Sequence, residues 1–166
     1  PGDDIVYPTE GKVVHFEGEL GVVIGRPTRR VAAADALHYV LGYTIGNDVS
    51  ERVIQKKEMA NGCMLICKGF DTFKPLGPWI TTDLDPSDLQ LTTRVNGDMK
   101  QSSSTSDLIF PVPQLIEYMS AAMTLLPGDI IMTGTPSGVG DIQPGVEIVI
   151  DIEGIGTLSN PVVAER

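Results

Sequence analysis

The sequence predicts one domain of the α+β class that is predominantly β, and three observations carry this prediction. The 166 residues include 18 glycines and 12 prolines, which indicates many turns and short strands rather than a helix bundle. Several short segments alternate apolar and polar residues or are rich in β-branched residues, as strands are. Only the segments 32–41 and 112–123 show the apolar spacing of helices.

In the first half of the chain we expect three strands and one helix. The strands are predicted over residues 5–8, 13–24 and 43–46. The helix is predicted over residues 32–41, which are alanine-rich, and Gly42 is expected to end it. Residues 53–67 match no single periodicity and are left open.

The second half begins with the clearest hairpin of the chain. Residues 89–95 alternate, Asn96-Gly97-Asp98 forms the turn, and the return strand starts at 99–101. Residues 102–106 are expected to be a polar loop, and 112–123 a helix. Further strands are predicted over 130–133, 146–152 and 157–163, with a glycine-rich loop over 134–140.

Composition limits the partners. The net charge of −10 and a pI near 4.5 argue against nucleic acid and against an anionic membrane surface. Cys63 and Cys67 have no second pair and no histidine at ligand spacing, so we expect reduced thiols rather than a zinc site. No signal peptide or membrane-length apolar run is found, and we expect a cytoplasmic protein.

Glu17 and Glu19 are the first candidate functional residues. They lie two apart at the start of an apolar run, so a strand would point both side chains to the same face. Two adjacent carboxylates repel each other, and a cation between them makes the arrangement favourable. The alternative is a solvated strand end without function.

Asp48 and Lys68 are further candidates. Asp48 follows a predicted strand, a frequent position for active-site residues, although Asn-Asp is also a common turn pair. Lys68 lies among apolar residues, which indicates either a carboxylate partner or a lowered pKa suited to proton transfer. A surface lysine whose charged end reaches solvent is the alternative.

Other residues could contact a substrate. Arg52 and Gln55 follow Asp48 and could bind a carboxylate, the arginine through two hydrogen bonds. The loop 134–140 offers backbone N–H groups and the Thr135 hydroxyl as an anion cradle, or is a plain surface turn. It matches neither nucleotide-binding glycine motif. His15 is kept only as a possible neighbour of Glu17 and Glu19.

Three carboxylates without a paired histidine or cysteine would select a hard cation. Mg²⁺ or Mn²⁺ carrying several waters is the expected ion. An ion held by only three side chains keeps open positions for a bidentate substrate.

Taken together, these segments resemble the fumarylacetoacetate hydrolase family. The order of the motifs is specific to the family, although each motif alone is weak. The matching segments are residues 17–25 (EGELGVVIG), 42–52 (GYTIGNDVSER), 68–73 (KGFDTF), 75–79 (PLGPW), 95–97 (VNG), 105–110 (TSDLIF), 126–140 (LPGDIIMTGTPSGVG) and 152–162 (IEGIGTLSNPV).

The resemblance implies a mixed β-sandwich roll with two or three short helices, usually dimeric, and a Mg²⁺ or Mn²⁺ site. It implies that Glu17, Glu19 and Asp48 are the metal ligands and that Lys68 is the catalytic lysine beside the substrate. The residues implied to hold the substrate's carboxylate and oxo groups are Arg52, Gln55, Gly134 and Thr135.

Family members cleave or rearrange 2-oxo and β-diketo acids. The resemblance implies acylpyruvate hydrolysis or oxaloacetate decarboxylation through a metal-stabilised enolate. Its alternatives are isomerisation or decarboxylation of a hydroxylated dienedioate and hydrolysis of a diketo sugar acid. A domain that binds a 2-oxo acid without catalysis is a further alternative.

Hydrolytic members carry a His–Glu pair on an N-terminal lid, and neither His15 nor His38 lies in such a motif. We therefore expect residues 1–166 to be one catalytic domain without that lid.

Overall fold

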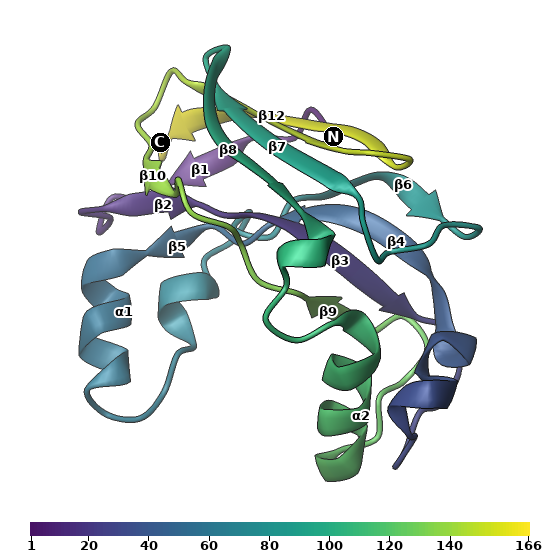
Figure 1. The fold of residues 1–166 in the computed structure, drawn as a ribbon. Coiled ribbons are helices and arrows are strands. Elements are labelled where there is room, and N and C mark those ends of the chain that lie inside the picture. The colour runs from purple at the N-terminus through teal and green to yellow at the C-terminus, as the bar shows by residue number, and fades with distance from the viewer.

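A computed structural model describes residues 1–166 and shows three β-sheets with short helices (Figure 1). The strands are β1 (Ile5–Tyr7), β2 (Val14–Phe16), β3 (Gly18–Ile24), β4 (Val40–Asn47), β5 (Ser50–Glu51), β6 (Leu76–Thr81), β7 (Gln90–Val95), β8 (Asp98–Ser104), β9 (Ile130–Met132), β10 (Gly140–Asp141), β11 (Glu147–Ile152) and β12 (Gly156–Ala164). The α-helices are α1 (Arg52–Met59) and α2 (Val112–Ala122), and 3₁₀ helices cover Ala33–Tyr39, Ile66–Lys68 and Thr105–Asp107. The predicted α+β class with a predominance of strands is confirmed.

Two larger sheets pack face to face. The five-stranded sheet has the order β1-β12-β11-β7-β8, and the four-stranded sheet has the order β6-β4-β3-β9. In Figure 1 the first lies above the second, while α1 and α2 lie below. The alternation predicted for β11 explains this packing, because Ile148, Ile150 and Ile152 are buried while Glu147 faces solvent. These isoleucines join one continuous core of 25 residues.

The predicted strand 13–24 is divided at Glu17. Its first part, β2, belongs to a small sheet of order β10-β2-β5, and its second part, β3, belongs to the four-stranded sheet. Every residue of β3 is buried. The chain therefore changes sheets at the residue predicted to be a metal ligand.

Three sequence-based expectations are corrected. The helix expected over 32–41 is a short 3₁₀ helix, and Gly42 lies inside β4, where a side chain would come within 2.4 Å of the Thr81 carbonyl oxygen on β6. The loop expected over 102–106 is the end of β8 followed by a 3₁₀ helix. Residues 76–81, for which no strand was predicted, form β6.

The helices of this chain are too short or too polar to pass through a bilayer.

Candidate metal centre

Neighbouring strands bring Glu17, Glu19 and Asp48 together. The antiparallel register of β3 and β4 pairs Gly18 with Asn47, so the residues just beyond this pair, Glu17 and Asp48, lie side by side. The Asp48 N–H donates to the Glu17 carbonyl oxygen at 2.9 Å, and the Glu17 N–H donates to Asn47 Oδ1 at 2.9 Å. These bonds fix the backbone of two candidate ligands against each other.

The three carboxylates converge as expected. One oxygen from each of Glu17, Glu19 and Asp48 lies within 4.8 Å of the other two. All three residues are buried, with 8%, 3% and 8% of their surface exposed. The structure thus supplies a compact set of oxygen donors, while their role as metal ligands remains a prediction.

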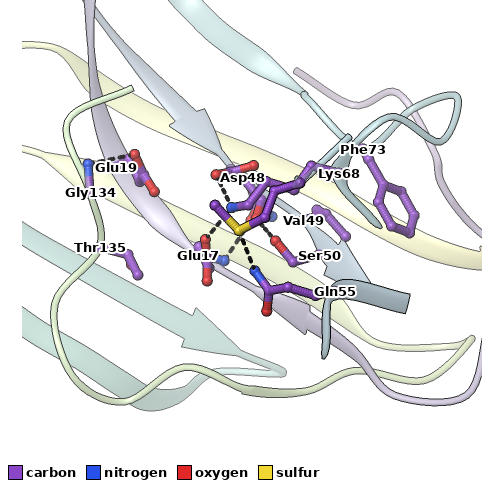
Figure 2. Close-up of polar contacts among 12 residues, drawn as sticks. Glu17, Glu19, Asp48, Val49, Ser50, Gln55, Lys68, Phe73, Gly134 and Thr135 are labelled. Atoms are coloured by element: carbon purple, nitrogen blue, oxygen red, sulfur yellow. Dashed lines mark hydrogen bonds and ion pairs between the residues drawn. The ribbon is translucent and has the colours of Figure 1, made fainter. Parts of the chain in front are cut away.

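Three cationic side chains face these carboxylates. Lys68 Nζ lies 3.1 Å from Glu17 Oε2 and pairs with Asp48 Oδ2, so it bridges the two residues (Figure 2). Arg52 pairs with Glu17 Oε1. Lys74, which was not among the predicted residues, places its Nζ 2.6 Å from Asp48 Oδ1. All three cations pair with Glu17 or Asp48, and none of them pairs with Glu19.

The position of Lys68 depends on a carboxylate outside the predicted site. Lys68 ends the short 3₁₀ helix Ile66–Lys68, and the Glu58 carboxylate accepts hydrogen bonds from the N–H groups of Leu65, Ile66 and Cys67 at 2.8–3.0 Å. Hydrogen bonds from the Cys67 side chain and from these N–H groups lower the pKa of Glu58 to about 2. Glu58 therefore stays ionised and holds the segment that presents the lysine.

Lys68 has the carboxylate partners that its apolar sequence neighbours require. Burial acts to lower its pKa, but the hydrogen bond to Asp48 and the charges of Glu17 and Asp48 outweigh burial and raise the pKa. Without a metal ion, Lys68 is therefore a stable ammonium group. Of the two alternatives that the sequence left open for Lys68, a carboxylate partner is therefore found, and a lowered pKa is not found in the metal-free protein.

Glu19 carries the strongest indication of an unmet charge. Burial, followed by the charges of Asp48 and Glu17, raises its pKa to about 7. The Gly134 N–H, which donates to Oε2 at 2.7 Å, and the charge of Lys68 only partly oppose this rise. A cation beside Glu19 would relieve the penalty. With oxygen donors only, the site fits a hard cation such as Mg²⁺ or Mn²⁺.

The predicted substrate-binding residues border the site, but several of their donors are already engaged. Arg52 Nη1 donates to Gln55 Oε1 at 2.9 Å, which joins these two residues on the first turn of α1. The Gly134 N–H binds Glu19 (Figure 2), and Thr135 Oγ1 donates to the Gly18 carbonyl oxygen at 2.9 Å. Gln55 Nε2 also faces Met64 Sδ at 3.7 Å, so Arg52, which has five N–H donors, is the most available contact for a substrate.

The two histidines differ in their relation to the site. His15 lies on β2 two residues from Glu17; burial lowers its pKa, and its Nδ1 has no protein partner. His38 is exposed on the 3₁₀ helix Ala33–Tyr39 and lines a separate hollow with Arg26 and Arg30. His15 alone remains a neighbour of the carboxylates.

Comparison with known proteins decides the family. The sequence pattern described as "Fumarylacetoacetate (FAA) hydrolase C-terminal" matches residues 1–163. The chain belongs to the fumarylacetoacetate hydrolase family. This confirms the resemblance drawn from the ordered motifs.

Three similar proteins show the breadth of the family. Protein Rv2993c of Mycobacterium tuberculosis is 54% identical over 98% of this chain and 62% of its own length. The crystal structure of 5-carboxymethyl-2-hydroxymuconate delta-isomerase from Mycobacterium smegmatis is 55% identical with a TM-score of 0.96, over 100% of this chain and 65% of that one. Maleylpyruvate hydrolase from Sphingobium sp. SYK-6, in complex with manganese(II) and pyruvate, is 40% identical with a TM-score of 0.90, over 100% of this chain and 61% of that one.

These comparisons confirm the mixed β fold as well as the family. The chain spans somewhat less than two thirds of the length of each of these three proteins. The family relation covers isomerases and hydrolases alike, so it supplies the fold rather than one reaction.

Proposed function

We propose that this chain is the catalytic domain of a Mg²⁺- or Mn²⁺-dependent enzyme that cleaves a C–C bond in a 2-oxo or β-diketo acid. The observation that carries the proposal is the buried cluster of Glu17, Glu19 and Asp48 with Lys68 bridging two of them. The manganese and pyruvate in the similar maleylpyruvate hydrolase support both the ion and the 2-oxo acid.

A second candidate reaction is the isomerisation of a 2-hydroxy-dienedioate. It is favoured by the 55% identity to the isomerase from Mycobacterium smegmatis. Both reactions involve an enolate whose oxygen lies on the carbon next to a carboxylate, so both would use the same cluster. They differ in whether a carbon–carbon bond breaks.

In the proposed site, one oxygen each from Glu17, Glu19 and Asp48 would hold the ion. When bound, such an ion supplies Lewis acidity, because it stabilises negative charge that builds on a substrate oxygen as a neighbouring bond breaks. Arg52, whose side chain is 22% exposed, keeps N–H donors beyond those used by Glu17 and Gln55. These donors can hold the substrate carboxylate and orient the reacting carbon.

Lys68 is positioned to hold and move the proton of the reaction. Its ammonium group is now kept by Glu17 and Asp48, and its pKa is raised mainly by these partners against the effect of burial. A cation that shared the charge of these two carboxylates would weaken their hold on the Lys68 ammonium group, so that the effect of burial would act to lower its pKa. Lys68 Nζ can then give its proton to a substrate carbon or accept one from it.

A panel of substrates tests the proposal. Oxaloacetate, acetylpyruvate, maleylpyruvate and a 2-hydroxy-dienedioate are incubated with the protein in Mg²⁺, in Mn²⁺ and in EDTA. Pyruvate release that depends on both the ion and the protein supports C–C cleavage, whereas a shift of the diene absorbance without pyruvate supports isomerisation. Glu19→Gln should lose the activity, and the exposed Asp83→Asn serves as a matched control. If no substrate is consumed with either ion, the proposed enzyme activity is wrong.

We also propose that the protein binds its small 2-oxo acid substrate as a homodimer. Several large apolar side chains are exposed, among them Ile109 at 88% and Tyr118 at 81%. Such side chains are frequent where a second chain covers the surface. Light scattering that gives the mass of one chain would contradict the dimer.

A further inference from the structure

Gln101 occupies an unusual place for a polar side chain on β8. The residues around it on this strand are mostly exposed, but Gln101 is 1% exposed. Both ends of its amide are engaged in hydrogen bonds. Oε1 accepts from the Gly18 N–H at 3.2 Å, while Nε2 donates to Thr135 Oγ1 at 2.8 Å and to the Pro136 carbonyl oxygen at 2.9 Å.

These bonds form a closed ring with Gly18 and Thr135. The Thr135 hydroxyl accepts from Gln101 and donates to the Gly18 carbonyl oxygen at 2.9 Å. Both backbone polar groups of Gly18 are therefore held by the same pair of side chains. A rotated amide would place a donor against the Gly18 N–H and an acceptor against the Pro136 carbonyl, so only one orientation of Gln101 satisfies the ring.

The ring takes the place of a missing strand neighbour. The carbonyl groups of Leu20 and Gly18 point to the same edge of β3, which is the edge that pairs with β9. The Leu20 carbonyl oxygen accepts a hydrogen bond from the Thr133 N–H, directly after β9, at 3.2 Å. Backbone pairing ends there. Beyond Thr133, two hydrogen bonds hold the loop 134–140 against β3. The Gly134 N–H donates to the Glu19 carboxylate, and the Thr135 hydroxyl donates to the Gly18 carbonyl oxygen.

Close packing leaves Gly18 little freedom on its other side. A side chain at Gly18 would approach Thr93 Oγ1 on β7 to 2.4 Å. The loop 134–140 also packs tightly on β8, because a side chain at Gly138 would come within 2.0 Å of the Lys100 carbonyl oxygen. Gln101 lies next to Lys100 and so joins the loop to Gly18 where the loop packs against β8.

Gly18 is the residue between Glu17 and Glu19, so the ring controls the backbone from which both carboxylates project. We propose that Gln101 is a positioning residue of the metal centre: it sets the directions of the Glu17 and Glu19 carboxylates through Gly18 and holds the loop whose Gly134 N–H anchors Glu19. This inference rests on the proposed metal function of the cluster. Gln101 contacts none of the three carboxylates and acts only through its neighbours.

The test is the Mn²⁺ affinity of Gln101→Met, measured by calorimetry without substrate. Methionine keeps the length and neutrality of glutamine but breaks all three hydrogen bonds. Changes in the residues that orient metal ligands typically weaken metal binding 10–100-fold. We expect a dissociation constant raised about tenfold for this variant.

Thr105→Val is the matched control. Thr105 is also buried and follows the same strand, and its hydroxyl accepts from the Leu89 N–H at 2.8 Å, at the open end of the β7–β8 hairpin. This variant should lose thermal stability while its Mn²⁺ affinity stays within about twofold of wild type. An equal loss of affinity in Thr105→Val would show a general structural effect and overturn the inference.

Thr135→Val opens the ring from the other side and replaces Gln101→Met if that variant does not fold. Because one ring is broken in either case, the double variant should bind Mn²⁺ about as well as the weaker single variant. Fully additive losses would contradict the ring.

Glu19→Gln separates this inference from the proposed function. If wild type binds Mn²⁺, Glu19→Gln does not, and Gln101→Met binds as wild type does, only the role of Gln101 is wrong. If wild type itself binds no Mn²⁺, both proposals are wrong.

Discussion

Glu19→Gln should stabilise the metal-free protein while removing its metal site. Glutamine has the same shape as glutamate, and its Oε1 can still accept the hydrogen bond from the Gly134 N–H. What it lacks is the charge, which at Glu19 is buried beside Glu17 and Asp48 and has only partial compensation. The negative charge of Glu19, which would bind a cation, therefore destabilises the folded protein when no cation is bound.

The magnitude follows from the pKa of Glu19, which burial raises from 4.5 to about 7. Between these two values the folded state binds more protons than the unfolded state, so stability falls as the pH rises and the loss is complete above pH 7. At about 1.36 kcal/mol per pKa unit, the ionised form costs about 3 kcal/mol. Since burial of the glutamine amide offsets part of the gain, we expect Glu19→Gln to be about 1–3 kcal/mol more stable at pH 8.

Urea unfolding in EDTA at pH 4.5 and pH 8 measures this difference. The advantage of Glu19→Gln should be present at pH 8 and small at pH 4.5. Mn²⁺ at 100 times its dissociation constant should stabilise wild type by about 2.7 kcal/mol and leave the variant unchanged. Glu153→Gln is the control, because Glu153 also accepts a backbone hydrogen bond, from the Gln90 N–H at 3.3 Å, but is exposed. A Glu19→Gln protein less stable than wild type at pH 8 in EDTA would refute the reasoning.

Three further predictions concern single side chains. Glu17→Ala should abolish Mn²⁺ binding in calorimetry, and an unchanged affinity would remove Glu17 from the ligand set. Lys68→Met should retain Mn²⁺ binding but lose about 10²–10⁴-fold in turnover, because it removes the group that moves the proton; turnover within tenfold of wild type would assign the proton to another residue. Ile150→Ala, in the fully buried row of β11, should lower the free energy of unfolding by about 2–5 kcal/mol in urea titration without changing Mn²⁺ affinity, and a loss below 1 kcal/mol would contradict the packing described for the two sheets.

Strands with one buried face were predictable because their sequence repeats every two residues. Ile148, Ile150 and Ile152 show this directly, and the Asn96-Gly97 turn marks the β7–β8 hairpin. The same period cannot show that the chain changes sheets at Glu17, since every residue of β3 after the break is buried and its burial does not alternate. Alanine-rich residues 33–39 have helical propensity, but the strand that begins at Val40 limits them to a short 3₁₀ helix.

The carboxylates of the site were predictable because their spacing and family motifs lie within short segments. The roles of three other residues were not predictable, because each contacts a segment that only folding brings next to it. These residues are Lys74, Glu58 and Gln101. Gln101, for example, reaches Gly18 from 83 residues away. A single glutamine on a polar strand carries no pattern that distinguishes it from its exposed neighbours.

The central claim is that Glu17, Glu19 and Asp48 hold one divalent ion. Anomalous diffraction from crystals soaked in Mn²⁺ tests it most directly. The claim predicts one strong manganese peak bonded to an oxygen of each of the three carboxylates, with Lys68 Nζ displaced from its bridging position between Glu17 and Asp48. Crystals that show Lys68 still bridging these carboxylates, and no manganese beside Glu19, would contradict it.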